Sequence, residues 1–209
     1  MALPPKSLRL YTLSTHGYGY SGLAQTDAPG IEESLVSWNK VWEFSDVESS
    51  HLKPGGWIET QEIHHRPYCR DGSMLLDHPV AQYWGLVSDG LDGLGVDSDA
   101  TLLLADMMRD AGFVNVTTRI FYVPIGKWPK NKTLKLVGSY WRAILLDGAQ
   151  PIALGPMTRG LKWSREQVEM RLVEVRRAYI DEWVHSYMPL HIPSSSILTR
   201  RSNVLRAPI

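Results

Sequence analysis

The sequence predicts an α/β fold, and three observations lead to that class. Segments with helical apolar spacing alternate with short extended segments along the chain. Residues 53–56, Lys-Pro-Gly-Gly, signal a turn, because proline fixes φ near about −65° and glycine accepts positive φ. The extended run Trp57–Ile63 follows at once, so the order is helix, glycine turn, strand. That order is the second half of a βαβ crossover.

Length and composition fit one substantial core. The chain has 209 residues, 44% of them hydrophobic, with 22 Lys+Arg against 22 Asp+Glu. This balance gives no charge excess for nucleic acid. The single cysteine, Cys69, excludes an internal disulfide framework and fits the cytoplasm or nucleus. No run reaches the ~20 apolar residues of a membrane helix. We therefore expect a soluble protein that binds neither nucleic acid nor membrane.

Residues 1–30 are predicted to be an irregular N-terminal segment. They contain Gly17-x-Gly19-x-x-Gly22, which matches the glycine fingerprint of nucleotide-binding folds. That fingerprint needs a helix directly behind it, whereas Pro29 and Gly30 interrupt the chain within about two turns. A tyrosine- and glycine-rich loop is the favoured interpretation.

The next segment predicts a helix before the glycine turn and a strand after it. Leu35, Trp38 and Trp42 recur at helical spacing, and the strand Trp57–Ile63 follows the turn. Ligands of open α/β sheets lie beyond the carboxyl ends of the strands.

Glu62, His64 and His65 lie at that strand end and are the best-placed polar groups. Either histidine is a candidate proton acceptor, because histidine titrates near neutral pH. The alternative is that they are solvated loop residues. A two-histidine metal site is disfavoured, because no carboxylate stands at helical spacing to complete it, and we expect no metal.

Residues 80–91 predict a helix after a loop at 67–79. Its apolar face is formed by Val80, Tyr83, Trp84, Val87 and Leu91. Tyr83 and Trp84 could line an aromatic substrate pocket, although core packing is the favoured role at this spacing.

A helix and a strand are predicted around Gly112. Asp97-Ser98-Asp99 offers N-cap oxygens for a helix that ends at Gly112. The alternating strand Phe113–Ile120 comes next. The helix face comprises Leu104, Met107, Met108 and Ala111; the two strand faces comprise Val114, Val116 and Ile120, and Asn115, Thr117 and Arg119.

The C-terminal third is predicted to be mainly helical. A stiff connector, 122–129, precedes a helix that is closed by Asp147-Gly148, and a second helix spans about 152–161. The first helix should direct Leu134, Val137, Trp141, Ile144 and Leu145 inward.

Ser164 and Gln167 form a capping box that opens another helix. This helix should bury Val168, Leu172, Val175 and Tyr179. The segment Val184–Ile192 predicts a last strand, which Pro193 ends. Residues 193–209 are predicted to be a flexible tail.

Four motifs occur in the order and spacing of a known group. They are Leu-Lys-Pro-Gly-Gly-Trp-Ile-Glu at 52–59, Ala-Gly-Phe-Val-Asn-Val at 111–116, Val-Pro-Ile-Gly-Lys-Trp-Pro-Lys at 123–130 and Leu-Lys-Trp-Ser-Arg-Glu-Gln-Val-Glu at 161–169. Over residues 38–191 the chain resembles the fungal LaeA-like class I methyltransferases of secondary metabolism, which use S-adenosylmethionine.

The resemblance implies the C-terminal half of a Rossmann-like methyltransferase sheet, with a helical cap over a pocket for a small hydrophobic metabolite. The domain would span residues 31–192, and its final strand would insert antiparallel. Chosen by position, the pocket residues would be Glu62, Tyr83, Trp84, Trp141 and Met157.

The family's cofactor-binding loop and acidic residue are expected well upstream of the glycine turn, where this chain has only about fifty residues. The sequence therefore predicts a truncated domain whose cofactor-binding residues are not assigned. The chain could be a methyltransferase, an inactive binding or regulatory module, or a cofactor-free pocket enzyme. An incomplete sheet also predicts a homo-oligomer or a partner protein that completes it.

Overall fold

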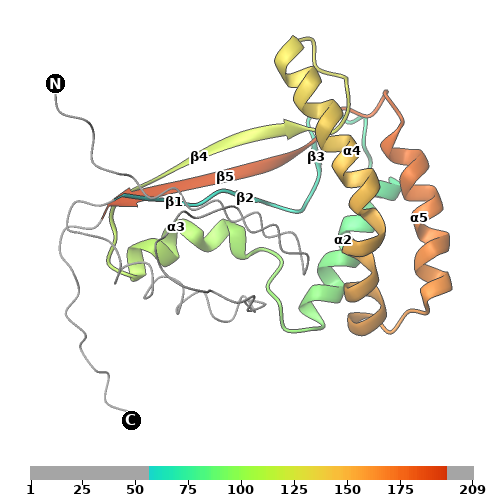
Figure 1. Ribbon diagram of the computed structural model, residues 1–209, viewed down its shortest axis with the longest axis horizontal. Coiled ribbons are helices and arrows are strands. Elements are labelled where there is room, and N and C mark those ends of the chain that lie inside the picture. The colour runs from blue at the N-terminus through green and yellow to red at the C-terminus, as the bar shows by residue number, and fades with distance from the viewer. Residues whose placement is uncertain (1–56, 197–209) are drawn as a thin grey trace, which may run out of the picture.

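The computed structural model describes residues 57–196. Its strands run together at one side with helix α3 beside them, and α2, α4 and α5 pack as a group at the other (Figure 1). The glycine motif at 17–22, the helix around Trp38, the turn at 53–56 and the residues from 197 onward lie outside the described residues.

The described strands form an antiparallel sheet around β5, so the fold is mixed α/β as predicted. The last strand pairs with β1, β2 and β3 along one edge and with β4 along the other. Because β1 and β4 both run antiparallel to β5, they are parallel to each other. This is the inserted final strand that the resemblance implied. The strands are β1 Trp57–Glu59, β2 Glu62–Ile63, β3 Tyr68–Cys69, β4 Val114–Pro124 and β5 Ser186–Ser196.

Strand β5 continues through Pro193, so the prediction that this proline ends the strand and begins a tail was wrong for residues 193–196. The carbonyls of Pro189 and Pro193 accept bonds from the backbone N–H groups of His64 (2.9 Å) and Thr60 (3.1 Å). The backbone nitrogens of both prolines, which carry no hydrogen, therefore face the β1–β3 edge as well. That edge breaks into three short strands opposite the two prolines, whereas β4 pairs without a break from Thr117 to Pro124.

Strand β4 is longer than predicted and includes the first residues of the expected connector. A register shift lies between Val114 and Thr117, where Asn115 has φ 54°. This irregularity is a β-bulge. Ile120, predicted on one face with Val114 and Val116, is exposed, as are all residues from Thr117 to Tyr122.

Three helices agree with the sequence. They are α2 Pro79–Asp92, α3 Ala100–Asp110 and α5 Arg165–Tyr179. The predicted apolar faces of α2 and α5 are buried. The capping box is present, with Ser164 and Gln167 bonded in both directions.

Helix α4, Lys132–Gly155, replaces the two helices predicted for this region and runs on into a π-helical turn, η2, Pro156–Gly160. Asp147-Gly148 does not end it, and Pro151 lies inside it. The buried face consists of Gly138, Leu145, Ala149 and Ala153.

The predicted inward residues Leu134, Val137 and Ile144 are exposed on α4 instead. The reason is a close backbone contact, in which Gly126 N–H donates to the Gly138 carbonyl at 3.0 Å. A side chain at position 138 would collide with Gly126, so the helix turns its smallest residue inward.

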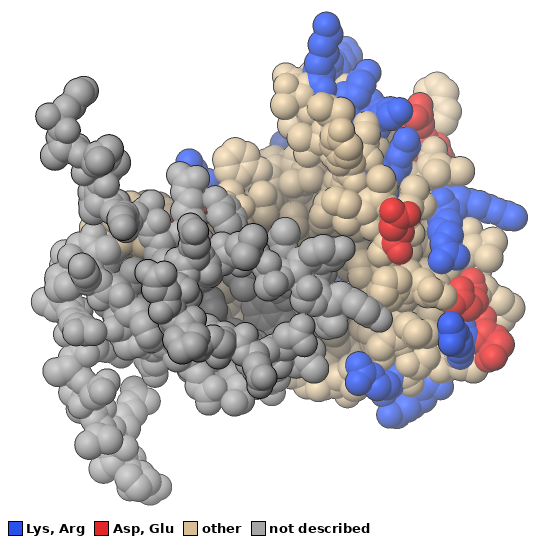
Figure 2. Space-filling view, in the orientation of Figure 1, with Lys and Arg blue, Asp and Glu red and all other residues tan. Residues whose placement is uncertain are grey.

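The main core lies between α2, α4, α5 and η2, and a smaller cluster under α3 joins Ile58, Met108, Ala111 and Phe113. Basic and acidic side chains intermix over α5, while lysines gather at the start of α4 (Figure 2). Among the described helices, none has the length and apolar character to cross a membrane.

Candidate functional site

Three side chains form a hydrogen-bonded chain just beyond the end of strand β2. His64 is only 2% exposed; its Nε2 lies 3.0 Å from Asp99 Oδ1 and its Nδ1 lies 3.2 Å from Tyr68 Oη. A carboxylate accepts only, so Nε2–H donates to Asp99 in the neutral ring and Nδ1 accepts from the Tyr68 hydroxyl. The order is therefore Asp99, His64, Tyr68, with the buried histidine between two exposed side chains.

Asp99 was expected to cap helix α3, but its side chain makes no cap bond. It instead accepts from His64 and from both Nε (3.0 Å) and Nη2 (3.1 Å) of Arg66. These donors favour the charged carboxylate, so the hydrogen bond from His64, followed by Arg66, holds the pKa of Asp99 below its ordinary value. No local sequence pattern indicates this pairing, because Asp99 lies 35 residues from His64 and 33 from Arg66 along the chain.

His191 extends the cluster from strand β5. It stands opposite Glu62 in the register, and its ring lies edge-on to His64 with centroids 6.2 Å apart. Burial, with a smaller contribution from the charge on His64, lowers the pKa of His191. The site thus favours a neutral imidazole here.

That lowered pKa predicts a pH-dependent stability. As pH falls through about 6.5, the unfolded chain binds a proton on this histidine before the folded chain does, so the free energy of unfolding decreases. In His191→Gln, we expect the melting temperature to fall less between pH 7.5 and 5.5 than in the wild type. Some dependence should persist, because burial also lowers the pKa of His78. An equal fall in both proteins would contradict this assignment.

The structure places three of the sequence-predicted pocket residues in the main core. Tyr83, Trp84 and Met157 are at most 1% exposed. The Tyr83 hydroxyl donates to the Ala149 carbonyl at 2.8 Å, and Trp84 Nε1 donates to the Tyr179 hydroxyl at 2.8 Å. For Tyr83 and Trp84 this is the core-packing alternative that the helical spacing favoured, whereas Met157 was predicted only as a pocket residue.

The buried Trp84 bond gives a stability prediction. In Trp84→Phe the Tyr179 hydroxyl loses this donor while burial still holds the tyrosine inside the core. We expect a loss of about 1–3 kcal/mol in the free energy of unfolding, measured by urea denaturation. Tyr179→Phe in the same background should then restore part of the loss, because no unpaired hydroxyl remains. A full loss in the double variant would argue against the bond.

The other predicted residues are divided between two places. Glu62 is buried beside His191, and the ring of His65 stacks on Trp84 with centroids 5.4 Å apart. Trp141 packs against the main core, and its buried indole N–H has no acceptor within the described part of the chain. The structure therefore joins His65 to Trp84 but does not gather the whole set around one cavity.

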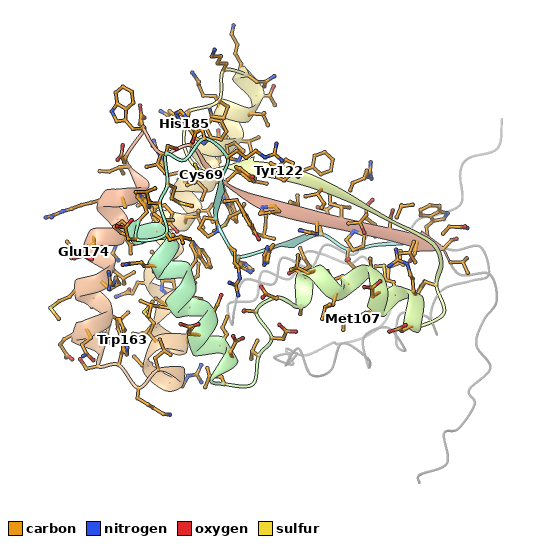
Figure 3. All side chains as sticks on the ribbon, turned by 180° about the vertical axis from the view of Figure 1, so that it is seen from behind. Cys69, Met107, Tyr122, Trp163, Glu174 and His185 are labelled. Carbon is orange, nitrogen blue, oxygen red and sulfur yellow. The ribbon has the colours of Figure 1, made fainter. Side chains whose placement is uncertain are left out.

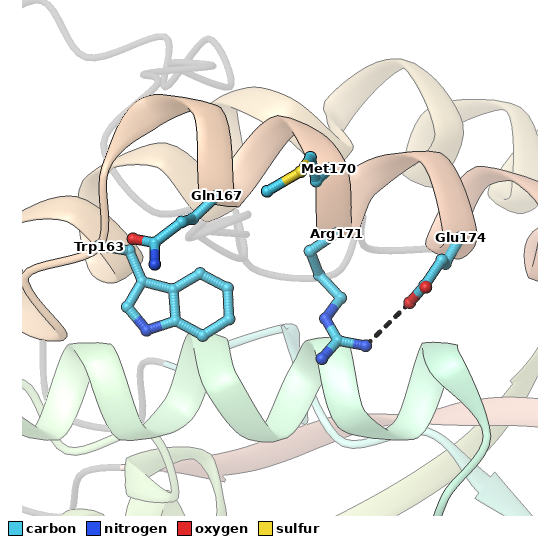
Figure 4. Close-up of a pocket in the computed structure, with 5 residues that line it drawn as sticks. All are labelled: Trp163, Gln167, Met170, Arg171 and Glu174. Carbon is cyan, nitrogen blue, oxygen red and sulfur yellow. Dashed lines mark hydrogen bonds and ion pairs between the residues drawn. The ribbon is translucent and has the colours of Figure 1, made fainter.

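None of the sequence-predicted pocket residues lines either of two further cavities. The first, of about 310 Å³, lies on α5 and is lined by Trp163, Gln167, Met170, Arg171 and Glu174 (Figure 4). Arg171 donates to Glu174 at 3.0 Å and to Gln82 of α2 at 3.2 Å, so its charge is already compensated. The second cavity lies where β4 ends and β5 begins.

Within residues 57–196, no group of three or more His, Cys, Asp or Glu side chains is arranged to hold a metal ion. The polar cluster around His64 is therefore built from hydrogen bonds and ion pairs between protein groups.

Comparison with known proteins identifies the relatives of this chain. No family model matches it. It is 29% identical over 137 residues to the methyltransferase pytC of Aspergillus terreus, which covers 66% of this chain and 42% of pytC. It is 27% identical over 161 residues to the secondary metabolism regulator LAE1 of Cochliobolus heterostrophus, covering 76% and 52%. For the protein-methionine methyltransferase laeA of Emericella nidulans, the identity is 24% over 148 residues, covering 68% and 38%.

These matches confirm the resemblance to fungal LaeA-like methyltransferases. The chain spans about half the length, or less, of the curated relatives it matches.

Proposed function

We propose that this chain, a relative of the fungal LaeA-like methyltransferases, forms the acceptor side of an S-adenosylmethionine-dependent methyltransferase of secondary metabolism. Its acceptor would be a small hydrophobic metabolite. The relatives supply the reaction class. The observation that carries the proposal is the Asp99–His64–Tyr68 chain, which lies beyond the carboxyl end of β2, where α/β folds bind ligands.

The described residues do not fit the cofactor by themselves. The family resemblance implies an acidic side chain for the ribose hydroxyls and a glycine-rich loop for the methionine carboxylate. Near the site, Asp99 is engaged by His64 and Arg66, and Glu62 is buried. We therefore assign no step to the cofactor and derive only what the chain's own groups do.

The hydrogen-bonded chain can take a proton from an acceptor hydroxyl. Tyr68 is 41% exposed and can meet a ligand, whereas His64 is almost wholly enclosed. The acceptor O–H would donate to Tyr68 Oη while the Tyr68 proton passes to His64 Nδ1, and Asp99 would stabilise the resulting imidazolium. Burial raises the pKa of Tyr68, which keeps the phenol neutral and able to relay the proton.

Cofactor binding is the direct test of this function. The proposal requires that the full 209-residue chain bind S-adenosylmethionine or its demethylated product. Such binding would give a calorimetric isotherm and raise the melting temperature, because a ligand that binds only the folded state stabilises it. Absence of both responses at millimolar ligand would remove the methyltransferase proposal for this chain alone.

A second candidate, a catalytically inactive binding or regulatory module, is favoured by one surface feature. Leu136, Tyr140 and Ile144 are exposed one turn apart along α4, an arrangement that suits contact with another protein. Four relatives also carry the name secondary metabolism regulator. Under this candidate a partner protein or a second copy would complete the assembly. The molar mass from light scattering would test self-association. If the protein is a monomer and does not bind the cofactor, this candidate requires a separate partner protein.

A further inference from the structure

The second cavity is a slot with aromatic walls and a volume of about 330 Å³. Its walls come from the β3 region, the end of β4, the connector before α4, the first turn of α4 and the start of β5. Figure 3 shows Cys69, Tyr122 and His185 converging on this region. Its volume lies at the lower end of the ~300–1,000 Å³ of small-molecule pockets, which suits a ligand of about two fused rings.

The rings of the slot are held in place by the protein itself. Tyr122 meets Tyr187 edge-on with centroids 5.1 Å apart. Trp128 stacks on His185 at 5.2 Å, and its indole N–H donates to the Ser186 carbonyl at 3.0 Å. A planar ligand would thus enter a preformed aromatic site and would not have to order these side chains.

Arg70 gives the slot a positive charge. Its guanidinium carbon lies 4.6 Å from the Tyr122 ring centroid and 5.7 Å from that of Tyr187, and Nε donates to the Tyr187 hydroxyl at 3.2 Å. These contacts orient the group but do not neutralise it. No carboxylate of the described residues forms an ion pair with Arg70.

The acidic residue of the slot, Asp71, forms its hydrogen bonds with groups other than Arg70. Its carboxylate accepts bonds from His185 Nδ1, the Cys69 thiol and the Ser73 backbone N–H. These hydrogen bonds, the largest from Cys69, hold the pKa of Asp71 well below its ordinary value.

The surroundings of the slot are basic. Residues 111–146 contain no Asp or Glu. The same stretch exposes Lys127, Lys130, Lys132 and Lys135 beside the lining residues Trp128 and Leu134. Figure 2 shows blue side chains gathered at this end of α4. Such a field attracts anions and repels cations.

We propose that this slot binds a planar aromatic carboxylic acid. The rings of the ligand would lie among Tyr122, Trp128 and Tyr187, and its carboxylate would pair with the guanidinium of Arg70 in a charge-assisted contact. The slot adjoins the Asp99–His64–Tyr68 chain, because Tyr187 stacks on Tyr68 with ring centroids 6.2 Å apart, but none of those three side chains lines it. Binding in the slot does not depend on methyl transfer.

Calorimetric titration with 2-naphthoate, and with the neutral 2-naphthamide as the matched ligand, tests the proposal. We expect the wild type to bind the acid about 10–100-fold more tightly, since a hydrogen bond to a charged group contributes about 1.5–3 kcal/mol. Higher salt should reduce this difference. Arg70→Met keeps the apolar stem and should bind both ligands equally and weakly. Arg119→Met removes an exposed arginine outside the slot and should retain the preference.

Thermal unfolding of each variant shows whether it folds. If Arg70→Met fails to fold, Trp128→Leu is the second variant and should weaken both ligands while keeping the preference for the acid. Wild-type protein that binds neither ligand, or a preference for the acid that survives Arg70→Met, would overturn the proposal. Neither result bears on cofactor binding, so the two proposals can fail separately.

Discussion

Replacement of Gly90 by alanine is expected to destabilise the protein by at least about 3 kcal/mol, the upper part of the usual range for overpacking. Gly90 lies in α2 where the helix meets the π-helical turn η2. A Cβ on this residue would lie 2.5 Å from the Pro156 carbonyl oxygen and 2.6 Å from its carbon. Gly160 makes the reciprocal contact, because its own Cβ would collide with the Gly90 carbonyl. Both obstacles are backbone atoms, so no side-chain rotation can relieve the clash.

Gly85→Ala is the matched control in the same helix. No atom lies within 4 Å of the Cβ that it adds. Alanine is favoured over glycine inside a helix by about 0.5–1 kcal/mol, so this variant should be slightly more stable than the wild type. Urea denaturation of the three proteins measures both effects. Similar stabilities for Gly85→Ala and Gly90→Ala would show that the α2–η2 contact is looser than described.

The helices that the sequence predicted well are those with a complete local pattern. In α5, the capping box at Ser164 and four apolar positions at helical spacing all indicate the same element. Helix α4 was predicted less well, because Gly148 and Pro151 look like helix breakers. A helix can retain both when packing elsewhere compensates, and the contact of Gly138 with Gly126 is invisible in a one-dimensional pattern.

Strand β5 shows the same difference between local and tertiary information. Prolines are disfavoured within strands, so Pro193 looked like an end. In the fold, the carbonyls of Pro189 and Pro193 face the β1–β3 edge. Both prolines lie opposite the gaps between the short strands of that edge. Placing them required the partners of each residue, which the local sequence does not contain.

The candidate site was predictable only in part, for a related reason. The end of the Trp57 strand identified Glu62, His64 and His65, because strand ends are general ligand positions. Asp99 and His191 reach His64 through the fold from other elements. The aromatic slot likewise combines residues from five segments, and no single segment of the sequence carried its pattern.

Replacement of Tyr68 by phenylalanine should reduce the rate of methyl transfer to a hydroxyl acceptor by about 10²–10⁴-fold, the usual contribution of a positioned acid or base. The variant removes only the hydroxyl that donates to His64 Nδ1. The acceptor proton then has no hydroxyl through which to reach Nδ1 of the enclosed imidazole. Affinity for S-adenosylmethionine should not change, because Tyr68 is proposed to contact the acceptor and not the cofactor.

A set of variants distinguishes a relay from a structural role of Tyr68. His64→Gln should give a similar loss, and the double variant should lose little more, since members of one proton path act as a unit. Tyr140→Phe on the outer surface of α4 is the control and should retain full rate. If both single variants kept the wild-type rate while cofactor still bound, proton removal would have to occur elsewhere. If instead the rate losses of the two single variants multiplied in the double variant, Tyr68 and His64 would act independently. In a single proton path, removing either residue already stops transfer, so removing the second should add little.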